Sequence, residues 1–123
     1  SDEDLAWLVP SPEGLADKVA QILDKGVKLV IVTEGKDGAT AFRAHGTPLK
    51  VAARKAEVVD TVGAGDTFNA GILAKLHDLG ALDKSAIATL SDTAIREALA
   101  FGAQVAAVTV SRAGANPPYR AEL

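Results

Sequence analysis

The feature that most constrains the fold of this chain is a run of small residues that leads directly into an amphipathic pattern. The run is DTVGAGDTFNAG, from Asp60 to Gly71, and apolar residues recur at spacings of four, four and three: Phe68, Ile72, Leu76 and Leu79. This spacing predicts one apolar stripe along a helix from about Ala64 to Asp78. A small-residue loop before a helix lets an anionic ligand approach backbone N–H groups that the first turn leaves unpaired.

Asp66 lies in the first turn of this predicted helix. The helix dipole favours a negative charge there, beside the N–H groups of Gly63, Ala64 and Gly65. Phosphoryl transfer to an alcohol requires such a pairing, because a base takes the hydroxyl proton while donors stabilise the phosphoryl oxygens. Spacing alone equally allows Asp66 to be only a helix-start acid and the glycines only a tight turn.

Composition limits the classes of function. The 123 residues are enough for one domain, and with 48% hydrophobic and only 4% aromatic residues we expect a core of Ala, Val and Leu. The net charge of −3 gives no basic surface for nucleic acid, and no apolar run is long enough to span a membrane. With no secretory signal and no cysteine, a cytoplasmic protein without disulfides is the default expectation.

The first half of the chain follows an α/β pattern. A helix is predicted from about Glu13 to Lys25 with Gly26 as its stop, after a shorter capped helix at 1–8. The apolar run KLVIVT, from Lys28 to Thr33, predicts a strand buried on both faces in a parallel sheet. Two further strands, 39–44 and 47–52, are expected to form a hairpin.

The hairpin turn is predicted at His45-Gly46, with His45 exposed and without a catalytic role. Later in the chain, Ser91 and Asp92 open a long helix rich in Ala and Gly. Residues 108–111 either end that helix or form a short strand, and the Gly and Pro content of 111–118 predicts a loop.

A glycine-containing turn, Thr33-Glu34-Gly35-Lys36-Asp37-Gly38, follows the apolar strand at the edge where open α/β sheets bind ligands. It is not a P-loop, because Asp37 follows the lysine and Val30 occupies the place of the first glycine. The Gly63-Ala64-Gly65 run is not a dinucleotide motif either, because Phe68 stands where the third glycine belongs.

The run from Asp60 to Leu73, DTVGAGDTFNAGIL, resembles the C-terminal signature of the ribokinase-like (pfkB-type) family of sugar and nucleoside kinases. The resemblance implies an α/β, ribokinase-like three-layer fold with a mostly parallel sheet flanked by helices. It implies that Asp66 is the catalytic base and that the backbone of Gly63, Ala64 and Gly65 forms the anion hole. The turn after the apolar strand resembles the family's Thr-x-Gly-x-x-Gly nucleotide loop, which implies that Thr33, Gly35 and Gly38 bind ATP.

The resemblance also implies metal ions, with Mg²⁺ accompanying ATP. An Asn-x-x-Glu element of the family organises the magnesium and phosphate region, and here Ser1 and Asp4 stand in its places, both departures from the usual residues. By the same resemblance Asp60, with backbone carbonyls near Ala113 and Gly114, would supply ligands for a monovalent cation such as K⁺.

Three stretches, SDEDLAWL, FNAGILAKLHDLG and AAVTVSRAGANPP, are most similar to bacterial fructokinases within the family. The predicted reaction is transfer of the ATP γ-phosphoryl group to a small sugar, with fructose as first choice. Two alternatives stay open: a kinase for 2-keto-3-deoxygluconate, ribose or a nucleoside, and a nucleotide-binding module without catalysis.

The chain contains no Met, even at position 1, and family members are roughly two to three times as long. We therefore expect residues 1–123 to be the C-terminal nucleotide-binding and catalytic part, without the N-terminal sugar-binding half and lid. A homodimer of the full-length protein is a further expectation.

Overall fold

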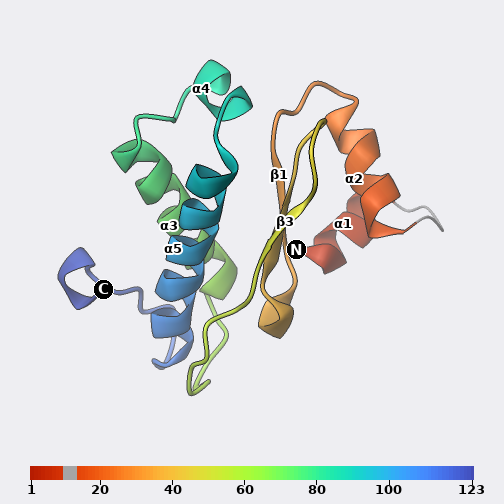
Figure 1. Cartoon of the computed structure of the whole chain (residues 1–123). Coiled ribbons are helices and arrows are strands. Elements are labelled where there is room, and N and C mark those ends of the chain that lie inside the picture. Colours follow the sequence, from red (N-terminus) through yellow and green to blue (C-terminus); the bar gives the residue numbers. More distant parts are fainter. Residues whose placement is uncertain (10–13) are drawn as a thin grey trace.

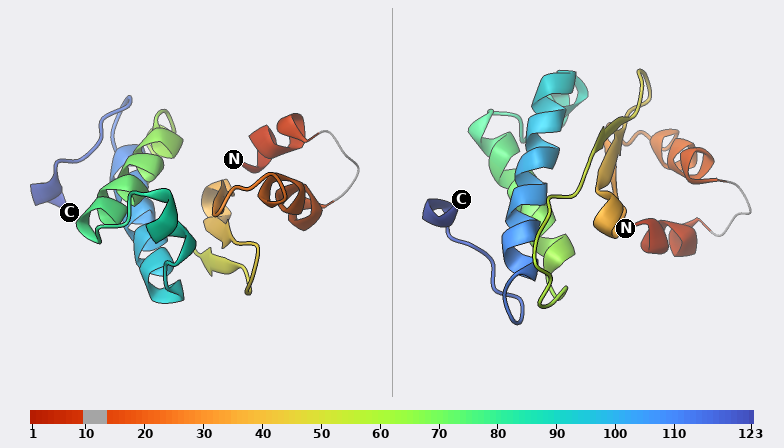
Figure 2. Two further views of the ribbon diagram at one scale, coloured as in Figure 1. Left: turned by 90° about the horizontal axis from the view of Figure 1, so that it is seen from above. Right: turned by 60° about the horizontal axis from the view of Figure 1, so that its bottom comes forward.

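The chain folds into three layers, with a small sheet between two pairs of helices (Figures 1 and 2). The computed structural model describes residues 1–9 and 14–123, so the predicted start of a helix at Glu13 lies outside the described residues. One outer layer holds α1 (Asp2–Leu8) and α2 (Leu15–Leu23), and the other holds α3 (Ala64–Asp78) and α5 (Asp92–Val110). The remaining elements are β1 (Val30–Thr33), η1 (Gly35–Asp37), β2 (Ala39–Phe42), β3 (Leu49–Val51), α4 (Lys84–Ala88) and η2 (Arg120–Glu122).

Side chains of β1 alternate between the two helical layers. Val30 and Val32 pack with α1 and α2, whereas Ile31 packs against the core that α3 and α5 share with the sheet. Apolar side chains on both faces explain why the strand reads as a continuous hydrophobic run. The expectation that both faces are covered is therefore confirmed.

The described strands pair only in the antiparallel sense, in the order β1-β2-β3. The parallel pairing expected for 28–33 is therefore not found among the described residues. The physical reason is the short turn after Thr33, because a connection of a few residues can join only antiparallel neighbours.

The two-residue turn predicted at His45-Gly46 is wrong, because β2 ends at Phe42 and β3 begins at Leu49. The chain leaves the sheet early because the Arg43 guanidinium turns toward the start of α5. It donates to the Leu90 carbonyl oxygen at 3.1 Å and also pairs with the Asp92 carboxylate. His45 is exposed, as expected.

The central helix α3 has the bounds that the apolar spacing predicts, Ala64–Asp78. Phe68, Ile72 and Leu76 are buried against α5 and the sheet. Leu79, the fourth residue of the predicted stripe, is 42% exposed, because the helix ends before it and Gly80 turns the chain away with φ +69°.

Helix α5 continues to Val110, so residues 108–110 are helical and the strand alternative for 108–111 is wrong. Ser91 caps its first turn, with its hydroxyl oxygen accepting from the Ala94 amide at 3.1 Å. Ser1 caps α1 in the same way. None of the helices within the described residues is both long and apolar enough to cross a bilayer.

Helices α3 and α5 run antiparallel (Figure 1) and approach each other most closely through two glycines. A Cβ added at Gly71 would lie 2.9 Å from the Gly102 Cα, and one added at Gly102 would lie 2.9 Å from the Phe68 carbonyl oxygen. The nearest atom at each place belongs to the backbone of the other helix, which cannot yield without moving that helix. The contact therefore requires glycine on each side.

We expect Gly71→Ala to destabilise the protein by about 1–3 kcal/mol, because overpacking forces two helices apart. Gly65→Ala on the same helix is the control: a Cβ there meets nothing within 4 Å. It should be neutral or slightly stabilising, since Ala is the better helix former by roughly 0.5–1 kcal/mol. Thermal unfolding of both variants checks this, and equal melting temperatures would contradict the assigned contact.

Candidate active site

Several segments far apart in the sequence meet at one end of the molecule (Figure 1). They are η1, the connection from β3 to α3, the first turn of α3, and the loop that follows α5. The start of α1 also lies next to η1 in each view (Figures 1 and 2). Most of the residues singled out from the sequence therefore gather at this end.

Gly63 is the N-cap of α3 and adopts φ +79°, a left-handed conformation that favours glycine. It has no room for a side chain either, because a Cβ there would lie 2.9 Å from the Ala115 Cβ. The amides of Gly63 and Gly65 have no acceptor among the described residues, whereas the Ala64 amide already donates to the Thr61 carbonyl at 3.2 Å. Two of the three amides expected in the anion hole are thus free to bind a ligand.

Asp66 is the third residue of α3, and its exposed carboxylate has no partner in the part of the chain that the structure describes. The next residue, Thr67, behaves differently: it is buried, and its hydroxyl donates back to the Gly63 carbonyl at 3.0 Å. A carboxylate in the first helical turn lies near the unpaired amides and the positive end of the helix dipole. Asp66 therefore presents an unpaired carboxylate beside the unpaired amides of Gly63 and Gly65.

Asp60 fastens the loop before α3 to the loop after α5. Its Oδ1 accepts from the Val62 amide and its Oδ2 from the Gly114 amide, both at 3.0 Å. These donors, first that of Val62, favour the ionised carboxylate and lower the pKa of Asp60. The amides of Val59 and Asp60 in turn donate to the Val110 carbonyl at 2.7 and 3.1 Å.

The sequence predicts the Gly114 carbonyl as a cation ligand together with Asp60, whereas the contact that the structure shows between these two residues is made by the Gly114 amide. Residue identity cannot distinguish these two roles, because every residue except proline carries both groups. Ala115 was missed altogether, since only the fold places it over Gly63.

The turn after β1 contains the three residues predicted to bind ATP. Thr33 ends the strand and pairs with Ala39, and Gly35 opens η1 with φ +55° and free space around it. Gly38 has φ +100°, and a Cβ there would overlap the Val51 carbonyl oxygen of β3. Gly38 is thus required by the sheet itself, whereas Gly35 leaves its surroundings open to a ligand.

Glu34 is part of this turn and was not singled out from the sequence. Its carboxylate accepts from the Thr40 hydroxyl at 2.6 Å and lies 3.9 Å from the Lys50 ammonium. The side chain is only 19% exposed and ties β2 and β3 to the base of the turn. No spacing rule would have found it, because its partners come from two other strands.

Asp4, the other residue predicted to contact a metal ion, lies in the first turn of α1. It belongs to the capping box of α1, where its Oδ2 accepts from the Ser1 hydroxyl at 2.7 Å, and this bond lowers the pKa of its exposed carboxyl. Across residues 1–9 and 14–123, no three or more His, Asp, Glu or Cys side chains are grouped so that they could hold a metal ion.

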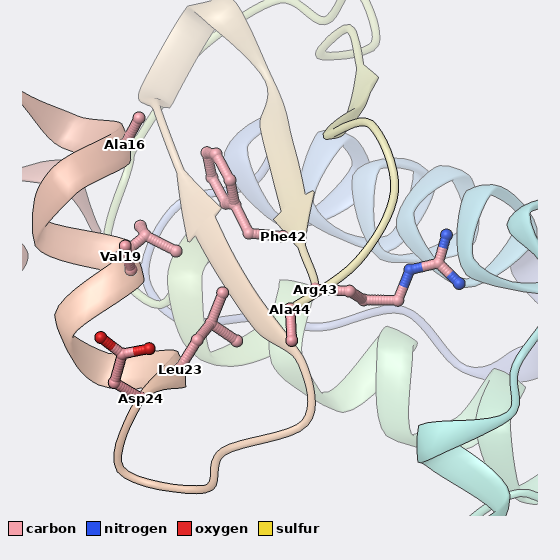
Figure 3. A pocket seen from close by; sticks show the side chains of 8 residues that line it. Ala16, Val19, Leu23, Asp24, Phe42, Arg43 and Ala44 are labelled. Atoms are coloured by element: carbon pink, nitrogen blue, oxygen red, sulfur yellow. The ribbon is translucent and has the colours of Figure 1, made fainter.

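A separate groove of about 220 Å³ lies between α2 and β2 (Figure 3). Apolar side chains line most of it, including Val19, Leu23 and Phe42, with Asp24 at its margin. The Arg43 side chain points away from it toward α5 (Figure 3). The groove is smaller than ordinary ligand pockets and has few polar groups. It is therefore a weaker candidate for the functional site than the end of the molecule that contains the start of α3.

The chain matches the model of the pfkB family carbohydrate kinases over residues 1–122. The chain belongs to the pfkB family. It is 44% identical over 98 residues to a fructokinase from Rhizobium leguminosarum bv. trifolii, an alignment that covers 78% of this chain and 29% of the relative. It thus spans less than a third of that relative's length.

Solved structures agree with this assignment. Arabidopsis thaliana ribokinase complexed with ribose and ATP superimposes with a TM-score of 0.73 at 30% identity, over 92% of this chain and 34% of that one. Vibrio cholerae O395 fructokinase in its fructose, ADP and calcium ion bound form gives a TM-score of 0.73 at 25% identity, over the same shares of both chains. The ribokinase-like α/β fold expected from the sequence is therefore confirmed.

The hydrogen bonds of Asp60 predict a pH dependence of the loop contact. Because its folded pKa lies below the unfolded value of about 3.9, the stabilisation is fully present above that value. It is lost as pH falls through the lowered folded pKa. The NMR shift of the Gly114 amide should therefore titrate below about pH 3.9, and Asp60→Asn should abolish this titration. A midpoint at or above the ordinary value would contradict the geometry.

Proposed function

We propose that this chain is the nucleotide-binding and catalytic part of an ATP-dependent sugar kinase. The observation that carries the proposal is the free carboxylate of Asp66, which stands in the first turn of α3 beside the unpaired amides of Gly63 and Gly65. Membership of the pfkB family supports the same chemistry. In a binding module without catalysis, a carboxylate beside a phosphate site would only repel the ligand, which disfavours that alternative.

In the proposed reaction, a sugar hydroxyl oxygen attacks the γ-phosphorus of ATP. The new O–P bond forms as the bond from the γ-phosphorus to the β,γ-bridging oxygen breaks, and ADP leaves. Asp66 accepts the hydroxyl proton, and the amides of Gly63 and Gly65 donate to the phosphoryl oxygens, where negative charge must be stabilised.

Thr33, Gly35 and Gly38 are proposed to contact the nucleotide from the turn after β1. The open space around Gly35 supports a ligand there, whereas Gly38 serves mainly to keep the turn close to β3. The relative from Arabidopsis thaliana was solved with ATP and ribose, and the one from Vibrio cholerae with ADP and fructose.

The described residues do not group three or more side chains that could hold Mg²⁺. This ion is commonly held by the ATP phosphates and by water, and in the proposed reaction it would neutralise charge on those phosphates. Asp4 and Asp60 as cation ligands, and a requirement for K⁺, stay predictions. Equal activity in sodium, potassium and choline buffers would contradict the K⁺ requirement.

Fructose is the proposed acceptor, since the relative with 44% identity is a fructokinase. Ribose, 2-keto-3-deoxygluconate and nucleosides are the competing acceptors, and a substrate panel on the full-length protein separates them. We propose that the sugar is held mainly by an N-terminal half with a lid that is outside these 123 residues. A cytoplasmic enzyme that forms a homodimer completes the proposal.

We expect Asp66→Asn in the full-length protein to lower kcat by about 10²-fold to 10⁴-fold, the usual contribution of a general base. ATP affinity should change little, because the amide donors remain. A coupled assay with ATP, Mg²⁺ and fructose measures kcat, and calorimetry measures ATP binding.

Asp17→Asn is the matched control. Asp17 is likewise the third residue of its helix, follows a glycine N-cap without a side-chain hydrogen bond, and is exposed, but it lies on α2. It should retain wild-type turnover. If Asp66→Asn kept most of its activity, or if both variants lost it equally, Asp66 would not be the base.

A further inference from the structure

The segment that follows α5 reaches the proposed site and forms only one short element of regular structure, η2, near its end. We define the tail loop as residues 113–121, between Arg112 and Glu122. Within it, the Asn116 amide donates to the Gly114 carbonyl, and two prolines, Pro117 and Pro118, have no amide to donate. The shape of this loop must therefore be set by contacts at its ends and at its tip.

The tip of the tail loop contacts the start of α3. The Gly114 amide donates to the Asp60 carboxylate at 3.0 Å, and Ala115 packs over Gly63 so closely that a side chain at Gly63 is excluded. Gly63 is held in its left-handed conformation between this loop and its own helix. Its amide and that of Gly65 are the donors that the proposed function needs.

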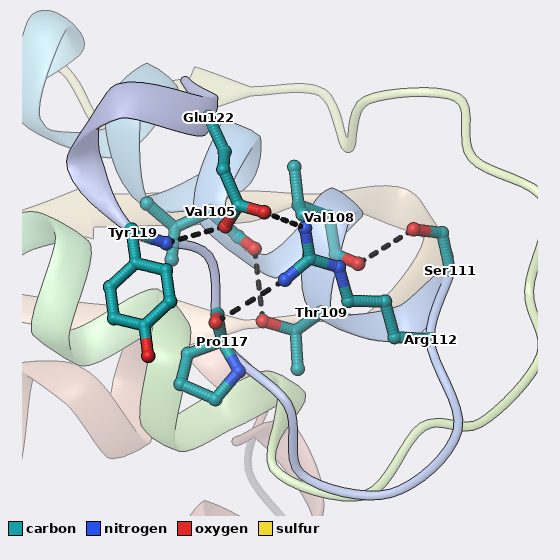
Figure 4. A network of polar contacts seen from close by, with 8 residues as sticks. All are labelled: Val105, Val108, Thr109, Ser111, Arg112, Pro117, Tyr119 and Glu122. Atoms are coloured by element: carbon teal, nitrogen blue, oxygen red, sulfur yellow. Dashed lines mark hydrogen bonds and ion pairs between the residues drawn. The ribbon is translucent and has the colours of Figure 1, made fainter.

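The base of the tail loop is closed by one arginine and one glutamate (Figure 4). Arg112 donates to Glu122 Oε1 at 2.8 Å and to the Pro117 carbonyl at 3.4 Å, while Glu122 Oε2 accepts from the Tyr119 amide at 2.7 Å. Both carboxylate oxygens are thus used, and one guanidinium contacts Pro117 within the loop and Glu122 at its end.

Arg112 is well placed to act as an anchor. Its own amide donates to the Thr109 carbonyl at 3.1 Å, so its backbone continues the last turn of α5. Thr109 is fully buried, and its hydroxyl donates to the Val105 carbonyl at 3.1 Å. The guanidinium therefore extends from a rigid helix end to a loop that has little structure of its own.

We propose that Arg112 is a positioning residue. Its ion pair with Glu122 holds the tail loop in contact with Asp60 and Gly63, and this contact orients the amides at the start of α3. The kinetic consequence of this inference rests on the proposed function, whereas its structural consequence does not. A second ion pair, Arg120 with Asp78, also holds the loop, but it joins it to the far end of α3 and is more exposed.

Arg112→Gln in the full-length protein tests the inference. The exchange rate of the Gly114 amide, followed by NMR, should rise about fivefold, the upper range for a partly exposed ion pair. The kcat for sugar phosphorylation should fall by a similar factor. Arg112→Lys keeps the charge but not the planar fork, so it should recover part of both effects.

The matched control is Arg43→Gln, because Arg43 also bridges a carbonyl and a carboxylate, those of Leu90 and Asp92, with similar exposure. It lies at the start of α5, about 28 Å from the end of this 19-residue helix. Its loss should lower the melting temperature without changing Gly114 exchange or kcat.

The proposal is overturned if Arg112→Gln lowers the melting temperature as Arg43→Gln does but leaves Gly114 exchange at the wild-type rate. Faster exchange with unchanged kcat in an active enzyme would also overturn it, because the loop would then move without affecting the amides. If the wild-type protein shows no sugar-dependent turnover, the proposed function fails, and the exchange comparison still decides whether Arg112 holds the loop.

Discussion

The close contact between α3 and α5 is the constraint on which the remaining structure depends. Two glycines, Gly71 and Gly102, let the helix backbones approach to a distance that no side chain would allow. Because the helices run antiparallel, the start of α3 lies beside the end of α5 (Figure 1). The loops at these two ends come from residues some fifty positions apart, yet they form one local environment, which Asp60 joins through the Gly114 amide.

Within that environment, the fold uses some polar groups and leaves others available. The amides of Val59, Asp60, Val62 and Ala64 all donate to acceptors within the two loops or at the end of α5. Among the described residues, the groups without partners include the amides of Gly63 and Gly65 and the carboxylate of Asp66. A rigid frame around a few unpaired donors is the arrangement that preorganised electrostatic stabilisation requires.

The sheet contributes a second rigid feature at the same end of the molecule. Gly38 allows the turn after β1 to lie against β3, and Glu34 fastens its base to Thr40 and approaches Lys50. The positive charge of Lys50 partly offsets the negative charge of Glu34, which limits the repulsion of an anionic ligand at this turn. The turn and the start of α3 are thus supported by separate layers of the fold.

The sequence by itself determined the elements whose signals are local. The bounds of α3, the caps of α1 and α5, and the coverage of both faces of β1 follow from apolar spacing, capping residues and hydrophobic runs, which act over one or two turns. The family signature between Asp60 and Leu73 was readable for the same reason, since it is contiguous. Only the tertiary structure decided matters that depend on distant partners: Arg43 leaves the sheet to meet Asp92, and Ala115 covers Gly63. Such contacts cannot be read from spacing, because the residues that make them are brought together only when the helices and the sheet pack.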